Sequence, residues 1–188
     1  MAVKRLTIDG FGQVEINNCA FRRDGRIEAQ CAPDTTAFSA AKVENGLLLA
    51  VDRANRTVTF ATDSTLPIAL VYSAEHIYDE RTPGLKNFAL NGKDDFYPRL
   101  GYLAIGDKYT TNCVSYDSAT WSDDATFLSA LASYKTTALY ATAGTDGSHV
   151  IASTVPSTAF GPVLKVVADT TMPDGTKGIM LQCMKVID

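Results

Sequence analysis

The chain has 188 residues, of which 46% are hydrophobic and 20% charged, and its formal net charge is −4. A chain of this length hides roughly 70% of its unfolded surface on folding, so its stability requires neither a disulfide framework nor a metal. The composition excludes wholesale disorder, and a mildly acidic chain with scattered Lys and Arg is not expected to bind nucleic acid or an anionic membrane.

The first predicted element is a hairpin, in which strands over 17–21 and 26–31 flank Asp24-Gly25, a common hairpin-turn dipeptide. A two-residue turn would set Phe21 opposite a glutamate, whereas a loop one residue longer sets it opposite Ile27. Only the longer loop brings the apolar residues onto one face, because side chains alternate along a strand. We therefore predict a three-residue loop.

Four cysteines stand at positions 19, 31, 113 and 183, without a CxxC pair. In the predicted register Cys19 pairs with Ala29 and lies diagonal to Cys31, about 7–8 Å away, which is too far for an easy disulfide. Both are predicted to be free thiols. A zinc site needs clustered ligands, and the chain contains only two histidines, so no metal site is expected.

A three-stranded antiparallel meander is predicted over residues 40–62. Its first turn is Asn45-Gly46, a dipeptide typical of type I′ turns, which would pair Val43 with Leu48. Both faces of the strand over 47–51 are apolar, which indicates a central strand covered on both sides.

The second turn of the meander is predicted at Ala54-Asn55. This turn sets Val51 opposite Val58 and Leu49 opposite Phe60. The strand that follows the turn alternates apolar residues with threonines, which is typical of a half-exposed strand at the edge of a sheet.

A further strand begins at Pro67, and a long connection over 79–98 follows it. Loops longer than about 12–15 residues are uncommon unless they are functional or docked. This one carries large apolar side chains, namely Leu85, Phe88, Leu90, Phe96 and Tyr97. Either these side chains pin the loop to its own domain, or they bind a partner. They are the candidate partner-binding residues of the chain.

One helix is predicted near 123–135, with Ser122 as its N-cap. Asp123 and Asp124 fall in the first turn, where they complement the helix dipole. An apolar stripe follows, formed by Phe127, Leu128, Leu131 and Tyr134. The paired aspartates also look like metal ligands or an acid–base couple. Adjacent helical residues point about 100° apart, however, and capping explains both.

The C-terminal half predicts more strands. They lie over 102–105 and 108–116, around Gly106-Asp107, and over 137–143, 149–155, 163–168 and 179–187. The last four form two hairpins, the second closed by Pro173-Asp174-Gly175, which suits a type I turn. The fold class expected is mainly β, with antiparallel hairpins in a sandwich-like or barrel-like arrangement. The chain is expected to form one domain over 1–188, with a smaller subdomain over about 100–188 as the alternative.

Catalytic groups are scarce. Two pairs could combine a nucleophile with a base, namely Cys113 with His149 and Ser148 with His149. Neither pair lies in a catalytic motif such as GxSxG or HExxH. The sequence Gly10-Phe11-Gly12 lacks the third glycine of a dinucleotide fingerprint. We therefore expect a protein that is not an enzyme and holds no cofactor.

The N-terminal residues and the apolar runs predict where the chain is made. Residues 1–10 lack the apolar h-region of a signal peptide. No apolar run approaches the ~20 residues of a membrane-spanning helix. Synthesis in a cytoplasm, without a membrane partner, is the expectation.

Four segments in this order resemble the head decoration (cement) or auxiliary capsid proteins of tailed phages: 79–85 (DERTPGL), 96–101 (FYPRLG), 106–112 (GDKYTTN) and 172–175 (MPDG). The resemblance implies a β-rich protein on the capsid surface of a virion, made in the host cytoplasm. Its partners would be the major capsid protein, another virion protein or a second copy of the chain. The alternatives are a tail or head–tail connector component, a carbohydrate-binding β-sandwich module and an unusual cysteine hydrolase.

Overall fold

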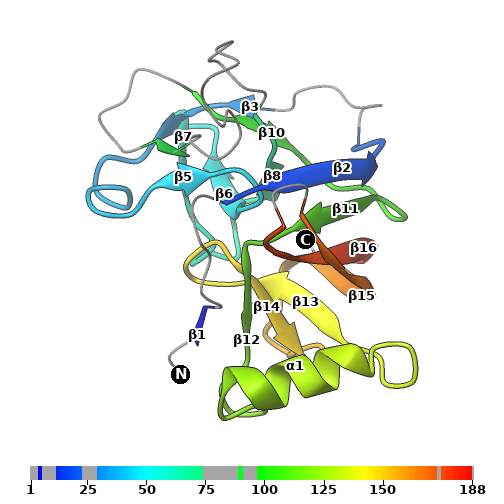
Figure 1. The fold of residues 1–188 in the computed structure, drawn as a ribbon. Coiled ribbons are helices and arrows are strands. Elements are labelled where there is room, and N and C mark those ends of the chain that lie inside the picture. Colours follow the sequence, from blue (N-terminus) through cyan, green and yellow to red (C-terminus); the bar gives the residue numbers. More distant parts are fainter. Residues whose placement is uncertain are drawn as a thin grey trace.

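The computed structural model describes residues 4–5, 12–22, 29–73, 89–90, 97–172 and 175–187. It is mainly β, with 44% strand and 6% helix. Two large sheets pack together, and the one described helix covers one end of the larger sheet (Figure 1). The predicted fold class is therefore confirmed.

The larger sheet has eight strands in the order β1-β12-β14-β13-β15-β16-β11-β2. Its pairs are antiparallel except β12 with β14, which run parallel. The strands are β1 (Lys4–Arg5), β2 (Val14–Asn18), β11 (Lys108–Thr111), β12 (Val114–Tyr116), β13 (Tyr140–Ala143), β14 (His149–Ala152), β15 (Gly161–Thr171) and β16 (Lys177–Ile187).

The second sheet has six strands in the order β3-β10-β8-β6-β7-β4, and only β4 and β7 pair in parallel. Its strands are β3 (Ala29–Gln30), β4 (Ala32–Pro33), β6 (Leu48–Asp52), β7 (Thr57–Phe60), β8 (Ile68–Val71) and β10 (Arg99–Gly101). A separate pair joins β5 (Val43–Glu44) to β9 (Ala89–Leu90).

The β6–β7 hairpin has the predicted register, with Val51 opposite Val58 and Leu49 opposite Phe60. Its turn is held by Asp52, whose carboxylate accepts the backbone N–H groups of Ala54 and Asn55, at 2.9 and 3.0 Å. β6 lies between β8 and β7 and is buried on both faces, as its apolar sequence predicts. β7 is not an edge strand, because β4 pairs along its other side.

The predicted hairpin at Asn45-Gly46 is wrong. β5 pairs with β9 instead of β6, whose second neighbour is β8. Gly46 does adopt the positive φ of +86° that the dipeptide predicts. A Cβ at this position would lie 2.3 Å from Thr111 Oγ1. The glycine therefore permits a close approach to the other sheet, and it does not close a local hairpin.

The predicted N-terminal hairpin is also wrong. β2 pairs with β11 in the larger sheet, and β3 pairs with β10 in the smaller one. Residues 23–28, including the predicted turn, lie outside the described part of the chain. All four cysteines are free thiols, which confirms the prediction for Cys19 and Cys31. The reason differs from the predicted one. Cys19 and Cys31 do not lie diagonally in one hairpin, because they follow strands of two different sheets.

The strands around Gly106-Asp107 are shorter than predicted, and one of them is displaced. Residues 99–101 form β10 of the smaller sheet, whereas residues 102–105 form no strand. The backbone N–H of Ala104 donates to the Asp107 carboxylate at 2.8 Å instead of to a neighbouring strand. The predicted strand over 108–116 is interrupted after Thr111, where the backbone N–H of Val114 turns back to the carbonyl of Asn112 at 2.9 Å.

Both C-terminal hairpins are present as predicted. β13 pairs antiparallel with β14, and β15 pairs with β16 over a longer stretch than the sequence indicates. The second hairpin closes with the backbone N–H of Gly175 donating to the carbonyl of Met172 at 2.9 Å. Pro173 and Asp174 lie outside the described residues.

The predicted helix is α1 (Asp124–Ala132), and its N-cap is Asp123 instead of Ser122. The Asp123 carboxylate accepts the backbone N–H of Thr126 at 2.8 Å. In return, the Thr126 hydroxyl oxygen accepts the backbone N–H of Asp123, which completes a capping box. Phe127 and Leu131 are buried, whereas Leu128 is 39% exposed. The helix therefore packs through a narrower stripe than the sequence predicts.

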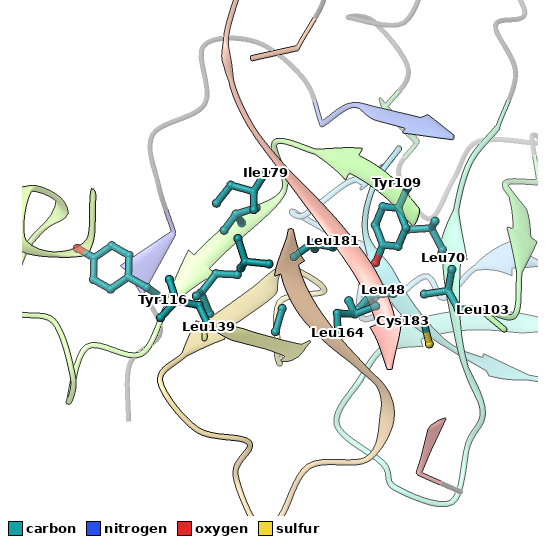
Figure 2. Close-up of a cluster of buried hydrophobic side chains, with 14 of the residues drawn as sticks. Leu48, Leu70, Leu103, Tyr109, Tyr116, Leu139, Leu164, Ile179, Leu181 and Cys183 are labelled. Atoms are coloured by element: carbon teal, nitrogen blue, oxygen red, sulfur yellow. The ribbon is translucent and has the colours of Figure 1, made fainter. Parts of the chain in front are cut away.

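The main core lies between the two sheets. Leu48 and Leu70 from the smaller sheet meet Tyr109, Leu164 and Leu181 from the larger one, and all five are fully buried (Figure 2). A second cluster covers the opposite face of the smaller sheet, with members that include Phe38, Val43, Leu49, Val58 and Leu100. The smaller sheet is thus covered on both faces.

Candidate partner-binding site

The connection over 79–98 leaves the smaller sheet from β8 and returns to it as β10, two strands that pair with each other. It is therefore a long excursion between neighbouring strands. Tyr97 is 49% exposed at its end, and Leu90 lies in β9. Leu85, Phe88 and Phe96, as well as the side chain of Leu90, lie outside what the structure describes.

Hydrogen bonds join the two ends of this excursion. Where the strands separate, the backbone N–H of Tyr72 donates to the Arg99 carbonyl at 3.0 Å. The backbone N–H of Arg99 donates to Ser73 Oγ at 2.8 Å, and Asn45 Nδ2 donates to the Ser73 carbonyl at 3.0 Å. Ser73 and Asn45 are both buried. The chain therefore leaves and re-enters the sheet at a fixed place.

The middle of the excursion touches its own domain at β9. Leu90 is paired with Val43 and Ala89 with Glu44, in the two-stranded sheet β5–β9. The Glu44 carboxylate in turn accepts the backbone N–H of Gly12 at 2.9 Å. Backbone pairing thus attaches the loop at this point, and partner binding by its apolar side chains stays a prediction.

The structure brings His149 close to Cys113 without forming a nucleophile–base pair. His149 Nδ1 lies 3.0 Å from the backbone carbonyl of Cys113, and Nε2 lies 2.7 Å from the Tyr109 hydroxyl. A carbonyl oxygen can only accept, so Nδ1 carries the proton and Tyr109 donates to Nε2. Both ring nitrogens are therefore occupied, and the Cys113 thiol donates to the Asn45 carbonyl at 3.3 Å.

Burial also keeps these groups in their neutral forms. It lowers the pKa of His149 from 6.5 to about 4 and raises the pKa of Tyr109 well above its ordinary value. It raises the pKa of Cys19 to about 12 and that of Cys183 to about 11. A thiol with such a pKa is almost fully protonated at neutral pH and is a poor nucleophile.

The Ser148 hydroxyl is hydrogen-bonded to Asp146 and Ser115 and not to His149. It donates to Asp146 Oδ1 at 2.5 Å and lies 2.7 Å from the Ser115 hydroxyl. Ser148 and Ser115 are fully buried. The arrangement connects the β13–β14 loop to β12.

Carboxylates and thiols do not gather into a metal site in the described part of the chain, where no group of three or more His, Cys, Asp or Glu residues could hold an ion. Asp123 caps α1, and Asp124 accepts a hydrogen bond from the Tyr116 hydroxyl at 2.7 Å. Over the same residues, no helix is long and apolar enough to cross a membrane.

Sequence reasoning missed two buried polar residues that join distant segments, of which Asn45 reaches the base of the connection. Asp107 reads as a turn residue, and Asn45 as half of a hairpin dipeptide. Each is instead buried and hydrogen-bonded to segments far away in sequence. Nothing in the local pattern distinguishes them from turn residues at the surface.

No family model, curated protein or solved structure matches this chain.

Proposed function

We propose that this chain is a structural protein of a tailed-phage virion that binds the capsid shell and decorates or stabilises it, and that the connection over 79–98 carries part of the contact. The observation that carries the proposal is the fixed base of this connection. Ser73 and Arg99 are joined by a 2.8 Å hydrogen bond, and Tyr97, close to this base, is 49% exposed.

The composition of the connection supports a role in binding. Ordering a residue costs on the order of 1–2 kcal/mol of backbone entropy, so a connection of this length needs surfaces that hold it. Each large apolar side chain supplies about 1.5–3 kcal/mol when it is fully buried. Pairing of β9 with β5 attaches two residues of the connection to the domain, and a shell protein would supply a further surface.

The chemistry of the described residues also suits a role made of surface contacts. The His149 ring uses both nitrogens in hydrogen bonds inside the core, and Cys19 and Cys183 are held as protonated thiols. Tyrosine, which combines a rigid apolar ring with a polar tip, is enriched in protein interfaces. The resemblance of four segments to capsid decoration proteins is the reason for proposing the major capsid protein or another virion protein as the partner.

The test is fractionation of a phage lysate that contains this protein. Assembled particles are sedimented, and the pellet is probed with an antibody against the chain. We expect the protein in the particle band, in stoichiometry with the capsid protein. Confinement to the soluble fraction would contradict every virion role, and recovery with tails alone would favour the tail or connector alternative.

A further inference from the structure

One row of side chains crosses four neighbouring strands of the larger sheet. Lys108 of β11 is opposite Gln182 of β16, Gln182 is opposite Lys165 of β15, and Lys165 is opposite Tyr140 of β13. Residues directly opposite each other point to the same face of a sheet. Leu181, the residue before Gln182, is fully buried in the core, so the row points away from the core. All four of its side chains are partly exposed.

The two lysines of this row have no acidic partner. Within the described residues, neither Lys108 nor Lys165 forms an ion pair or a hydrogen bond through its side chain. The two lysines flank Gln182, so their Cα atoms are about 9.5 Å apart, which is twice the spacing between neighbouring strands. The Gln182 amide between them can both donate and accept hydrogen bonds. The row therefore offers two positive charges at a set distance, with a neutral polar group between them.

Two exposed apolar side chains lie at the end of β16 and β11 where the row begins. Ile105 is 73% exposed and Met184 is 46% exposed. The turn that carries Ile105 is joined to β16 by two backbone hydrogen bonds, from Gly106 N–H to the Cys183 carbonyl and from Cys183 N–H to the Asp107 carbonyl, both 2.9 Å long. These bonds hold Ile105 and Met184 on neighbouring segments, so the lysine row has an apolar area beside it.

We propose that this face binds an extended segment of a partner protein in which two carboxylates flank apolar side chains. The carboxylates lie on Lys108 and Lys165, and an apolar side chain contacts Ile105 and Met184. An extended chain rises about 3.3 Å per residue, so carboxylates three residues apart match the spacing of the lysines. Apolar contacts beside charged groups are the ordinary composition of a protein interface. This surface is separate from the connection over 79–98.

The charge of the whole chain favours a short acidic segment over a nucleic acid. The formal net charge is −4, so a long polyanion would run from the row onto a surface that is acidic on balance and would be repelled there. Proteins that bind single strands also stack successive bases on several aromatic rings, whereas Tyr140 is the one aromatic residue among the four of the row. Ile105 and Met184 would have no role in contacts with phosphates.

The experiment titrates the full chain, with isotope-labelled Ile and Met methyl groups, with the peptide acetyl-Glu-Leu-Leu-Glu-amide. Two matched peptides carry glutamine in place of glutamate, or serine in place of leucine. We expect the first peptide to shift the methyl resonances of Ile105 and Met184 in a saturable way. The glutamine peptide should bind about threefold more weakly or worse, because it loses two exposed ion pairs, and the serine peptide should bind more weakly because it loses apolar contact. No saturable shift, or a matched peptide that binds as tightly as the first, would overturn the proposal.

The double variant Lys108→Gln/Lys165→Gln removes both charges of the row, and Lys42→Gln/Lys135→Gln is the matched control. Lys42 and Lys135 are exposed and lie outside the row, and the control changes the net charge by the same amount. The row variant should lose the preference for the glutamate peptide over the glutamine peptide, whereas the control should keep it. Equal effects of the two variants would contradict the assignment. Ile105→Ser alters a largely exposed side chain and provides a second test should the row variant fail to fold, because it should reduce the preference for leucine over serine. An unchanged preference would count against the apolar contact.

A second titration tests the other classes of anionic partner. Oligothymidylate and polygalacturonate, a polymer of sugar acids, replace the peptide at equal concentrations of negative charge. Weaker binding of both polymers than of acetyl-Glu-Leu-Leu-Glu-amide supports a protein partner. Tighter binding of either polymer would assign the face to a nucleic acid or an acidic glycan and would overturn the proposal. These measurements use the isolated protein, so their outcome is independent of whether the chain is a virion component.

Discussion

Replacing Asp107 with alanine should lower the free energy of unfolding by about 3–5 kcal/mol, a large part of the 5–15 kcal/mol typical of a domain. The Asp107 side chain is 3% exposed. Its carboxylate accepts three backbone N–H groups, from Ala20 at 2.8 Å, Phe21 at 3.1 Å and Ala104 at 2.8 Å. Alanine would leave all three donors without this partner, in a largely buried region.

Equilibrium unfolding in urea measures this loss, and Asp34→Ala is its control. The Asp34 carboxylate also accepts two backbone N–H groups, from Thr36 and Ala37, at 3.0 and 2.8 Å, but Asp34 is partly exposed, so water can replace its carboxylate. We expect a loss below about 1 kcal/mol for the control. Asp107→Asn keeps one acceptor oxygen and should fall between the two. A loss for Asp107→Ala no larger than for Asp34→Ala would show that the carboxylate does not hold these segments.

Acid should destabilise the protein through His149. Burial lowers its pKa in the folded state to about 4, below the 6.5 of an exposed histidine. The unfolded chain therefore binds more protons between these two values, so that stability is fully present above pH 6.5 and falls as the pH drops to 4. A difference of this size corresponds to about 3 kcal/mol in all.

The measurement compares His76→Gln with the double variant His76→Gln/His149→Gln, since the chain has only two histidines. The stability difference between the two proteins should shrink by about 3 kcal/mol from pH 7 to pH 4. If the double variant does not fold, the imidazole resonance of the single variant reports the pKa directly. A constant stability difference, or an imidazole that titrates near pH 6.5, would contradict the buried, neutral His149.

Elements whose signals are local could be predicted from the sequence. The β6–β7 hairpin has the predicted register because Ala54-Asn55 closes it and both strands match in apolar pattern. The helix is predicted to within one residue at its start, because acidic first-turn residues and an apolar stripe lie within a few residues of each other, although the predicted N-cap, Ser122, is one residue too early. The two C-terminal hairpins follow for the same reason.

Pairing between distant segments could not be predicted. Gly46 has the backbone conformation that its dipeptide indicates, but its function is a close approach to Thr111 in the other sheet. β2 reads as half of a hairpin, yet it pairs with β11, about ninety residues away. Such pairings depend on which strands lie next to each other in the folded sheets, and the local residue pattern does not indicate that order.

The candidate site also has features that the sequence predicts and features that it does not. The length and aromatic composition of the loop over 79–98 are visible in the sequence. The hydrogen bonds that fix its base are not, because in the sequence Asn45 reads as half of a hairpin dipeptide and Ser73 as a continuation of the strand that begins at Pro67.

The most direct test of the role proposed for the loop compares particle binding by Tyr97→Ala and Leu128→Ala. Both side chains are large, apolar and partly exposed, at 49% and 39%, and only Tyr97 lies in the loop. Truncation of an exposed side chain changes stability by about 0.5 kcal/mol or less, so both proteins should melt close to wild type. We predict that Tyr97→Ala reduces occupancy on sedimented capsids by about tenfold or more, as interface aromatic residues often do, while Leu128→Ala binds normally. Equal occupancy of the two variants would contradict the loop as the shell-binding surface.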